Sequence, residues 1–356
     1  MALPGTILEF LLQPQGMVLF VAASALVTGI VFETILKSLT PWVATKEWWP
    51  RARPLQKSLM LNFGVPEAAC DDFTLRQYYS YVIILCTHHL ICGLMMVPVV
   101  AYGWTESRST SQACFVVAVL MDVALNVYDW VRMFANTFLF ESVGKKLFGG
   151  VEKGPLQMFI VLGVLHHTLA LVTVCPLLLL YPDLASFHAI AMSLLLAGGI
   201  CFTSGSYKFT LDLTKFPDCC QFKFIVALQA TTILYTRGYV WFPQVYSALN
   251  KIWADGNLRF FCGGCAAAAL MTLFNVLMIL DAVGAAAKWL PRSMPKGTSG
   301  SCREPQEALS DGPRDASRPL RADAPERTPD LKGQSPGLPR IAGAARKGRG
   351  APAPAR

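Results

Sequence analysis

Four of the five histidines in this chain of 356 residues occur as two adjacent pairs, His88–His89 and His166–His167. Each pair lies about eleven or twelve residues into a long apolar stretch. If both stretches enter a membrane from the same face, both pairs reach a depth of roughly 17 Å. An imidazole at such a place can act as a general base or accept an acyl group transiently. The pattern predicts a shared polar cavity; the alternative is two pairs of packed, hydrogen-bonded histidines.

A second group of polar residues, Asp122, Asn126 and Asp129, lies between the two histidine pairs. Spacings of four and three residues place all three on one face of a helix. Carboxylates are costly in hydrocarbon, so this face should point into a helix bundle, with Asp122 near the depth of the histidines. For Asp129 the alternative is a local pair with Arg132, one turn further on.

The third candidate is Arg237, which lies in the middle of another apolar stretch. A guanidinium keeps its charge in proteins. It therefore needs a carboxylate, a cluster of carbonyl groups or an anionic substrate group. We expect it to reach Asp122 or Asp129. A structural ion pair and an anion-binding role both remain open for it.

The elements that position these residues are apolar stretches long enough to cross a bilayer, which takes roughly 20 residues. Seven such stretches occur, and they predict an all-α integral membrane protein. Only Pro182 and Asp183 separate the fourth from the fifth, which predicts a tight helical hairpin. The seven predicted spans are 16–37, 78–103, 111–135, 155–181, 184–206, 222–247 and 258–289.

The seven predicted spans place the connecting loops on alternate sides of the membrane, and the positively charged residues are distributed unevenly between these two sides. One side holds three loops rich in lysine and arginine and the C-terminal tail, whereas the other holds only Arg108, Lys251 and Arg259. Cytoplasmic loops carry the excess of positive charge. Residues 1–15 are therefore predicted to be lumenal and residues 291–356 cytosolic. The first span lacks a basic leader and is interpreted as a retained anchor.

The tail, residues 291–356, differs in composition from the rest. It carries 13 Lys and Arg against 7 Asp and Glu, a net charge of +6 out of +8 for the chain, with 11 prolines and no aromatic residue. Such a segment cannot bury enough apolar surface to fold, so disorder is predicted. The apolar remainder excludes a soluble enzyme with a nucleic-acid-binding face.

Other motifs are weaker. Cys262 and Cys265 have metal or redox spacing, but they lack a second Cys/His pair and open a helix rich in small residues, which favours packing. Cys219 and Cys220 lie beside the predicted inner face and are candidates for palmitoylation. Five histidines are too few for a membrane di-iron oxygenase, and no metal site or bound cofactor is predicted.

Taken in order, four segments resemble the TLC domain of ceramide synthases, TRAM-type proteins and TLC-domain-containing proteins. The resemblance covers residues 74–289 and implies six helices bundled around a lipid-accessible central cavity. One further helix precedes them. The expected organisation is an anchor helix and cytosolic loop (1–73), a membrane domain (74–290) and the tail. The four segments are Ser80–His89, Asn126–Asp129, His166–Leu171 and Arg237–Pro243.

The resemblance carries two functional hypotheses. Where ceramide synthases have a His-Asp-x-x-Asp element, this chain has Ser193–Gly198 without an aspartate. The chain is therefore more similar to the TLC-domain-containing branch, which implies handling of lipids or acyl chains in an endomembrane such as the endoplasmic reticulum. His88, His89, Asn126, Asp129 and Arg237 would then line the lipid site.

The alternative implied by the resemblance is N-acyl transfer onto a sphingoid base with acyl-CoA as the substrate. His166 and His167 would then be catalytic and Asp122 would orient them. In either case the expected partners are membrane lipids, no nucleic acid is expected, and a homo-oligomer remains open.

Overall fold

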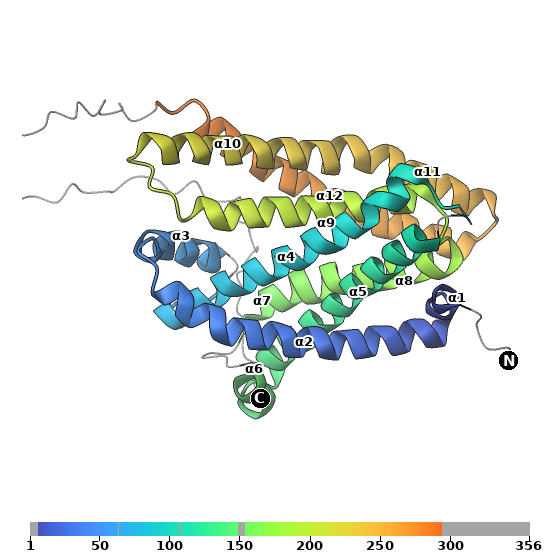
Figure 1. Cartoon of the computed structure of the whole chain (residues 1–356), viewed down its shortest axis with the longest axis horizontal. Helices are drawn as coiled ribbons and strands as arrows, with labels where there is room; N and C mark the ends of the chain where they lie inside the picture. The colour runs from blue at the N-terminus through green and yellow to red at the C-terminus, as the bar shows by residue number, and fades with distance from the viewer. Residues whose placement is uncertain (1–5, 63, 106, 108, 149–153, 294–356) are drawn as a thin grey trace, which may run out of the picture. The chain divides into compact units, whose positions relative to one another are not determined.

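The computed structural model describes residues 6–62, 64–105, 107, 109–148 and 154–293, and all regular elements among them are helices. Nearly all of the tail predicted to be disordered lies outside the described residues. The first half of the chain forms α1 (Ile7–Leu11), α2 (Pro14–Ala44), α3 (Trp49–Asn62), η1 (Glu67–Ala69), α4 (Asp72–Tyr102), α5 (Ser109–Phe138), η3 (Phe140–Gly144) and α6 (Lys145–Phe148) (Figure 1).

The second half continues with long helical segments, two of which contain π-helical turns in their interior. The segments are α7 (Leu156–Met158), η4 (Phe159–Thr168), α8 (Leu169–Leu180), α9 (Ala185–Lys208), α10 (Phe216–Ile233), η5 (Leu234–Val240), α11 (Trp241–Ala254) and α12 (Leu258–Trp289).

Six of the described helical segments are long and apolar enough to cross a membrane. They are α2, α4, α5, the run α7–η4–α8, α9 and α12, and each coincides with one of the predicted spans, except that three of the predicted spans extend one residue beyond the helix at one or both ends. The chain is therefore an all-α integral membrane protein.

The remaining predicted span, 222–247, lies within the run α10–η5–α11. This run is helical throughout but is not among the six apolar segments, and it carries Gln229 and Arg237. The Gln229 side chain is well satisfied: its Nε2 donates to the Cys201 carbonyl at 2.6 Å, and its Oε1 accepts from Lys208 Nζ at 3.0 Å. A seventh span stays a prediction.

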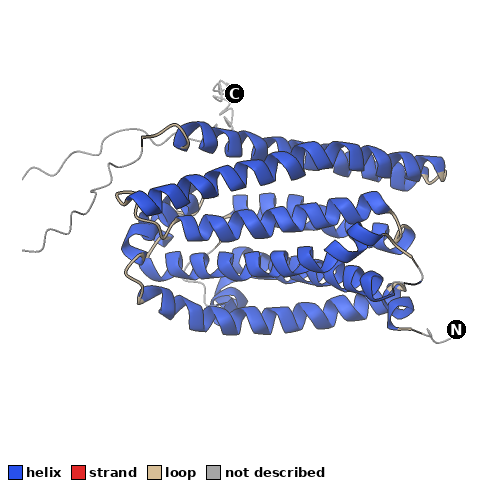
Figure 2. Cartoon of the chain, turned by 45° about the horizontal axis from the view of Figure 1, so that its top comes forward, coloured by secondary structure: helices blue, strands red, loops and turns tan. Residues whose placement is uncertain are grey.

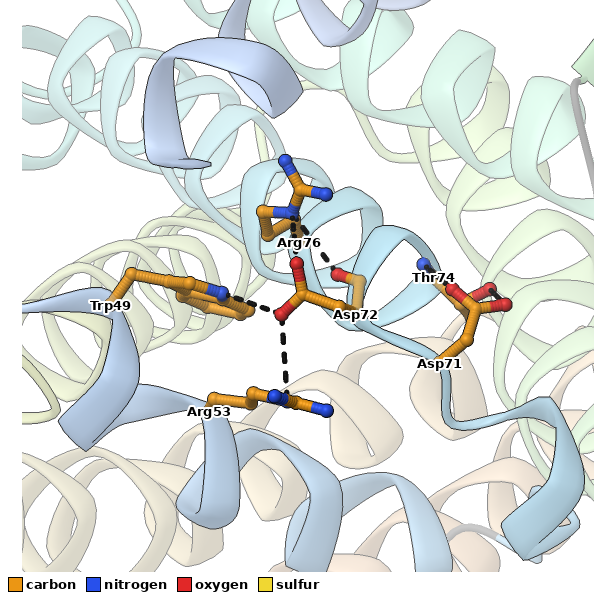
Figure 3. A network of polar contacts seen from close by, with 6 residues as sticks. All are labelled: Trp49, Arg53, Asp71, Asp72, Thr74 and Arg76. Carbon is orange, nitrogen blue, oxygen red and sulfur yellow. Dashed lines mark hydrogen bonds and ion pairs between the residues drawn. The ribbon is translucent and has the colours of Figure 1, made fainter. Parts of the chain in front are cut away.

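The start of α4 is fixed by side chains. Asp71 caps the helix by accepting from the Thr74 backbone N–H at 2.8 Å. The adjacent Asp72 joins α4 to α3 (Figure 3). Its Oδ1 accepts from Trp49 Nε1 at 2.9 Å and lies 3.4 Å from Arg53 Nε, while its Oδ2 lies 3.0 Å from Arg76 Nε. These contacts hold α3 against the first turn of α4.

Small residues allow α4 and α9, which are neighbours in Figure 1, to lie close together within the set of helices that Figure 2 shows. A Cβ atom at Gly199 would lie 2.7 Å from the backbone N and Cα atoms of Leu90. A Cβ atom at Gly93 would lie 2.9 Å from the backbone N of Leu196. Glycine at such crossings is the ordinary means of close helix approach in membranes.

The helix α5 is the most enclosed of the six. In its apolar window 61% of the residues are buried inside the protein, against 11–39% for the other five. It packs against α2, α4, α8 and η4. A polar face on this helix therefore meets neighbouring helices and not lipid, as the sequence predicts for Asp122, Asn126 and Asp129.

Candidate functional site

The helices line a pocket of about 590 Å³, with residues from α3, η1, α4, α5, α7, η4, α8, α9, α10, η5, α11 and α12. Most of the lining is apolar. Its polar side chains include seven of the eight predicted site residues. The seven are His89, Asp122, Asn126, Asp129, His166, His167 and Arg237.

Asn126 lies at the centre of the polar cluster. Its Nδ2 donates to Asp122 Oδ2 at 3.1 Å and to the Asp122 carbonyl at 2.9 Å. Its Oδ1 is in hydrogen-bond contact with His167 Nδ1. On the other side of Asp122, Oδ1 lies 3.8 Å from His89 Nε2. One amide therefore links a carboxylate from the same helix to a histidine from η4, and the carboxylate in turn faces a histidine from α4.

The second carboxylate of α5, Asp129, also faces a histidine. Its Oδ2 lies 3.7 Å from His167 Nε2. Arg132, the alternative partner, instead forms an ion pair with Glu33 on α2, with 3.2 Å between Arg132 Nε and Glu33 Oε1. Among the described residues the Asp129 carboxylate thus faces η4 across the bundle, and this contact is an ion pair only when His167 is protonated.

The two histidine pairs differ in how they are placed. In the first pair, His89 lines the pocket while His88 is absent from its lining. His88 Nε2 lies 3.5 Å from Cys92 Sγ, and its ring packs edge-on against Phe32 of α2, with the centroids 5.9 Å apart. One member of this pair therefore lines the pocket, and the other packs against a neighbouring helix. In the second pair both histidines line the pocket.

The prediction that Arg237 pairs with Asp122 or Asp129 is wrong. Arg237 Nη1 donates to Asn275 Oδ1 of α12 at 2.9 Å, and none of the ion pairs formed among the described residues involves this arginine. Both aspartates lie on α5 and face histidines, whereas Arg237 lies on η5, which packs against α9 and α12. The sequence signal for Asn275 is a lone amide in an apolar stretch, and it was missed.

Phe274 forms the wall between the arginine and the second histidine pair. Its ring centroid lies 6.0 Å from the Arg237 guanidinium carbon and 5.7 Å from the His166 ring. Nearby, Trp241 Nε1 donates to Thr272 Oγ1 at 2.9 Å, which ties α11 to α12. The part of the pocket around Arg237 is therefore built on η5, α11 and α12, whereas the second arginine of the lining, Arg132, lies on α5.

The second histidine pair, His166 and His167, and Arg237 all lie in π-helical turns. The histidine pair lies near the end of η4, and Arg237 lies in the middle of η5. Such turns are rare and frequently mark functional sites, because they change the direction of side chains within an otherwise regular helix. Sequence periodicity does not reveal them.

A polar cluster beside the pocket was also missed. Glu33 Oε1 accepts from the Tyr128 hydroxyl at 2.6 Å and from Arg132 Nε at 3.2 Å. The Arg132 guanidinium carbon lies 4.4 Å above the Tyr81 ring. The sequence signal for this cluster was Glu33, an ionisable residue inside the first predicted span. The cluster attaches α2 to α4 and α5.

Each of the two cysteine motifs lies near the start of a helix, α10 or α12. Cys262 and Cys265 are free thiols near the start of α12. No group of three or more His, Cys, Asp or Glu side chains among the described residues could hold a metal ion. Cys219 is buried and Cys220 half-buried, and their palmitoylation stays a prediction.

Comparisons of this chain with protein-family models, curated proteins and solved structures find no match. The resemblance to the TLC domain therefore depends on the sequence segments quoted above, and the function on the site itself.

Proposed function

We propose that this chain is a TLC-type endomembrane protein that binds a lipid or its acyl chain in the pocket and thereby influences membrane lipid composition or trafficking. A single observation carries the proposal. Polar side chains from four separate helical segments, α4, α5, η4 and η5, meet on a pocket whose lining is otherwise mostly apolar.

The pocket suits an amphipathic ligand. Ligand pockets commonly enclose about 300–1,000 Å³, with mostly apolar walls and a few polar groups that fix orientation. The volume of about 590 Å³ falls within that range. A hydrocarbon chain would contact the apolar lining, and a polar head group would contact the histidines, the Asp122–Asn126 pair or Arg237.

The proposal includes a topology. The run α10–η5–α11 would be the seventh span, with its polar groups turned towards α9 and α12. This places the N-terminus in the lumen and the tail in the cytosol, in agreement with the distribution of Lys and Arg. The compartment we propose is the endoplasmic reticulum or another endomembrane.

The test is labelling by a photoreactive lipid that bears a diazirine on a 16-carbon chain. Ala268→Trp would fill part of the pocket, because Ala268 belongs to its lining. Ala266→Trp, two residues earlier on the exposed surface of α12, is the matched control. We expect the first variant to lose most of the labelling and the second to retain it. Equal labelling of the two variants would contradict a lipid site in the pocket.

One observation favours a second candidate, N-acyl transfer from acyl-CoA. With its Nδ1 proton donated to Asn126, His167 keeps a lone pair on Nε2, the form that a general base requires. The amine nitrogen would bond to the thioester carbonyl carbon as the C–S bond breaks. His167 would pass the amine proton to the departing thiolate.

This candidate has its own assay. Membranes containing the protein are incubated with a sphingoid base and acyl-CoA, and N-acyl product is measured for the wild type and for His167→Ala. A product that depends on His167 would establish the enzyme. Lipid labelling in the absence of product would leave the binding function alone.

A further inference from the structure

Arg237 is a buried cation with incomplete bonding. The residue is 8% exposed. Only Nη1 has a hydrogen-bond partner among the described residues, the Asn275 side-chain oxygen at 2.9 Å. Nε is buried without a partner, and Asn275 Nδ2 is likewise buried without one. A guanidinium inside a membrane-spanning bundle ordinarily pairs with a carboxylate or another anion.

The acidic side chains nearest the polar cluster face other groups. Asp122 and Asp129 each lie within 4 Å of a histidine nitrogen, at 3.8 and 3.7 Å. Glu33 is bound by Arg132. No described carboxylate oxygen is within ion-pair distance of Arg237, so the part of the chain that the structure describes gives this charge no anionic partner.

Arg237 is nevertheless placed to meet a ligand, because it belongs to the lining of the pocket. Asn275 binds one nitrogen of the guanidinium, and the Phe274 ring, which also lines the pocket, has its centroid 6.0 Å from the guanidinium carbon. Because Nε is buried, the N–H groups left for a ligand are those of the two Nη nitrogens, which the bond to Asn275 holds in a fixed plane. That arrangement suits the paired oxygens of a carboxylate or phosphate.

We infer that Arg237 binds the anionic head group of the lipid in the pocket, a carboxylate or a phosphate, with Asn275 as its positioning residue. The inference depends on the proposed lipid-binding function and narrows it to one ligand class. A lipid with an uncharged head group would leave Arg237 without a partner, and a cationic lipid would be repelled. The polar groups of α5 would then face a different part of the ligand.

The experiment compares four photoreactive probes that share one 16-carbon diazirine chain and differ only in the head group. The probes are the fatty acid, the alkyl phosphate, the fatty alcohol and the alkylamine. They are added to the purified full-length chain in nanodiscs of uncharged lipid. We expect the acid or the phosphate to bind at least tenfold more tightly than the alcohol, and the amine to bind most weakly. The acid and phosphate arms decide which anion is preferred.

Three variants connect the preference to Arg237. In Arg237→Gln the anionic probe should fall to the affinity of the alcohol, whereas Arg237→Lys should retain part of the preference. Arg259→Gln, the same change at an exposed position in the first turn of α12, should bind as the wild type does. The alcohol should bind all four proteins equally, which controls for misfolding.

Asn275→Asp gives the sharpest result, because it supplies an internal anion of nearly the same shape beside Arg237. We expect this variant to melt at a higher temperature without ligand and to lose its preference for the anionic probe, while binding of the alcohol persists. Equal binding of all four probes to the wild type, with no effect of Arg237→Gln, would overturn the inference and leave lipid binding intact. Absence of labelling by every probe would overturn the proposed function as well.

Discussion

The ion pair between Glu33 and Arg132 is expected to be the main attachment of α2 to the rest of the bundle, and Glu33→Gln tests this. The carboxylate accepts from two donors, the Tyr128 hydroxyl at 2.6 Å and Arg132 Nε at 3.2 Å. The side chains of Glu33 and Arg132 are only 16% and 14% exposed. Glutamine keeps the size and one acceptor oxygen but removes the negative charge.

The expected loss follows from burial. Hydrogen bonds to charged groups contribute about 1.5–3 kcal/mol each, and removing one partner of a buried pair costs about 3–5 kcal/mol. Glutamine still accepts one bond, and Tyr81 still contacts the guanidinium, so we expect about 3 kcal/mol. At roughly 2–4 °C per kcal/mol for a large domain, the melting temperature should fall by roughly 6–12 °C.

The assay is thermal unfolding of the purified protein in one fixed detergent, with two comparison variants. Glu67→Gln removes the same charge from an exposed pair with Lys57, whose ammonium lowers the pKa of the Glu67 carboxyl, and should leave the melting temperature unchanged. Glu33→Gln combined with Arg132→Met should recover much of the loss, because no unpaired charge remains buried. If Glu33→Gln and Glu67→Gln melt at the same temperature within experimental error, the ion pair does not attach α2.

Three further predictions concern packing, local order and topology. Gly199→Ala should lower the melting temperature, because its Cβ would lie 2.7 Å from backbone atoms of Leu90; Gly263→Ala, with nothing within 4 Å, should not. Asp72→Ala should raise deuterium uptake in α3 but cost less than about 1 kcal/mol overall, since the carboxylate is 41% exposed. Protease added to sealed microsomes should remove a C-terminal tag and spare an N-terminal one; the opposite pattern would reverse the proposed topology.

The fold was largely predictable because lipid imposes a simple constraint. A membrane-spanning segment must satisfy its own backbone hydrogen bonds, so length and hydropathy are enough to locate a helix. Six predicted spans correspond to helical segments that are long and apolar enough to cross. The exception, α10–η5–α11, has its apolar character lowered by Gln229 and Arg237, and here hydropathy does not establish a span.

Part of the site was predictable because carboxylates on one face of a helix are costly to expose to lipid, so that face must point into the bundle. Asp122, Asn126 and Asp129 lie at spacings of four and three on α5, and the sequence alone places them inside the bundle. Their partners were less predictable. Which histidine of each pair faces inward depends on helix rotation, and at His166 and His167 a π-helical turn changes that rotation. No pattern of apolar residues records such a turn.

The wrong prediction that Arg237 pairs with Asp122 or Asp129 has a physical origin. The free energy needed to bury an unpaired charge predicts that a buried cation pairs with the nearest carboxylate. Here both carboxylates belong to α5 and face histidines. Arg237 bonds instead to Asn275 of α12, and the Phe274 ring lies 6.0 Å from its guanidinium carbon and 5.7 Å from the His166 ring. A protein that needed this charge only for stability could use an aspartate at position 275. An asparagine there fixes the guanidinium but leaves its charge unpaired, which is the arrangement expected if an incoming anion supplies the balance.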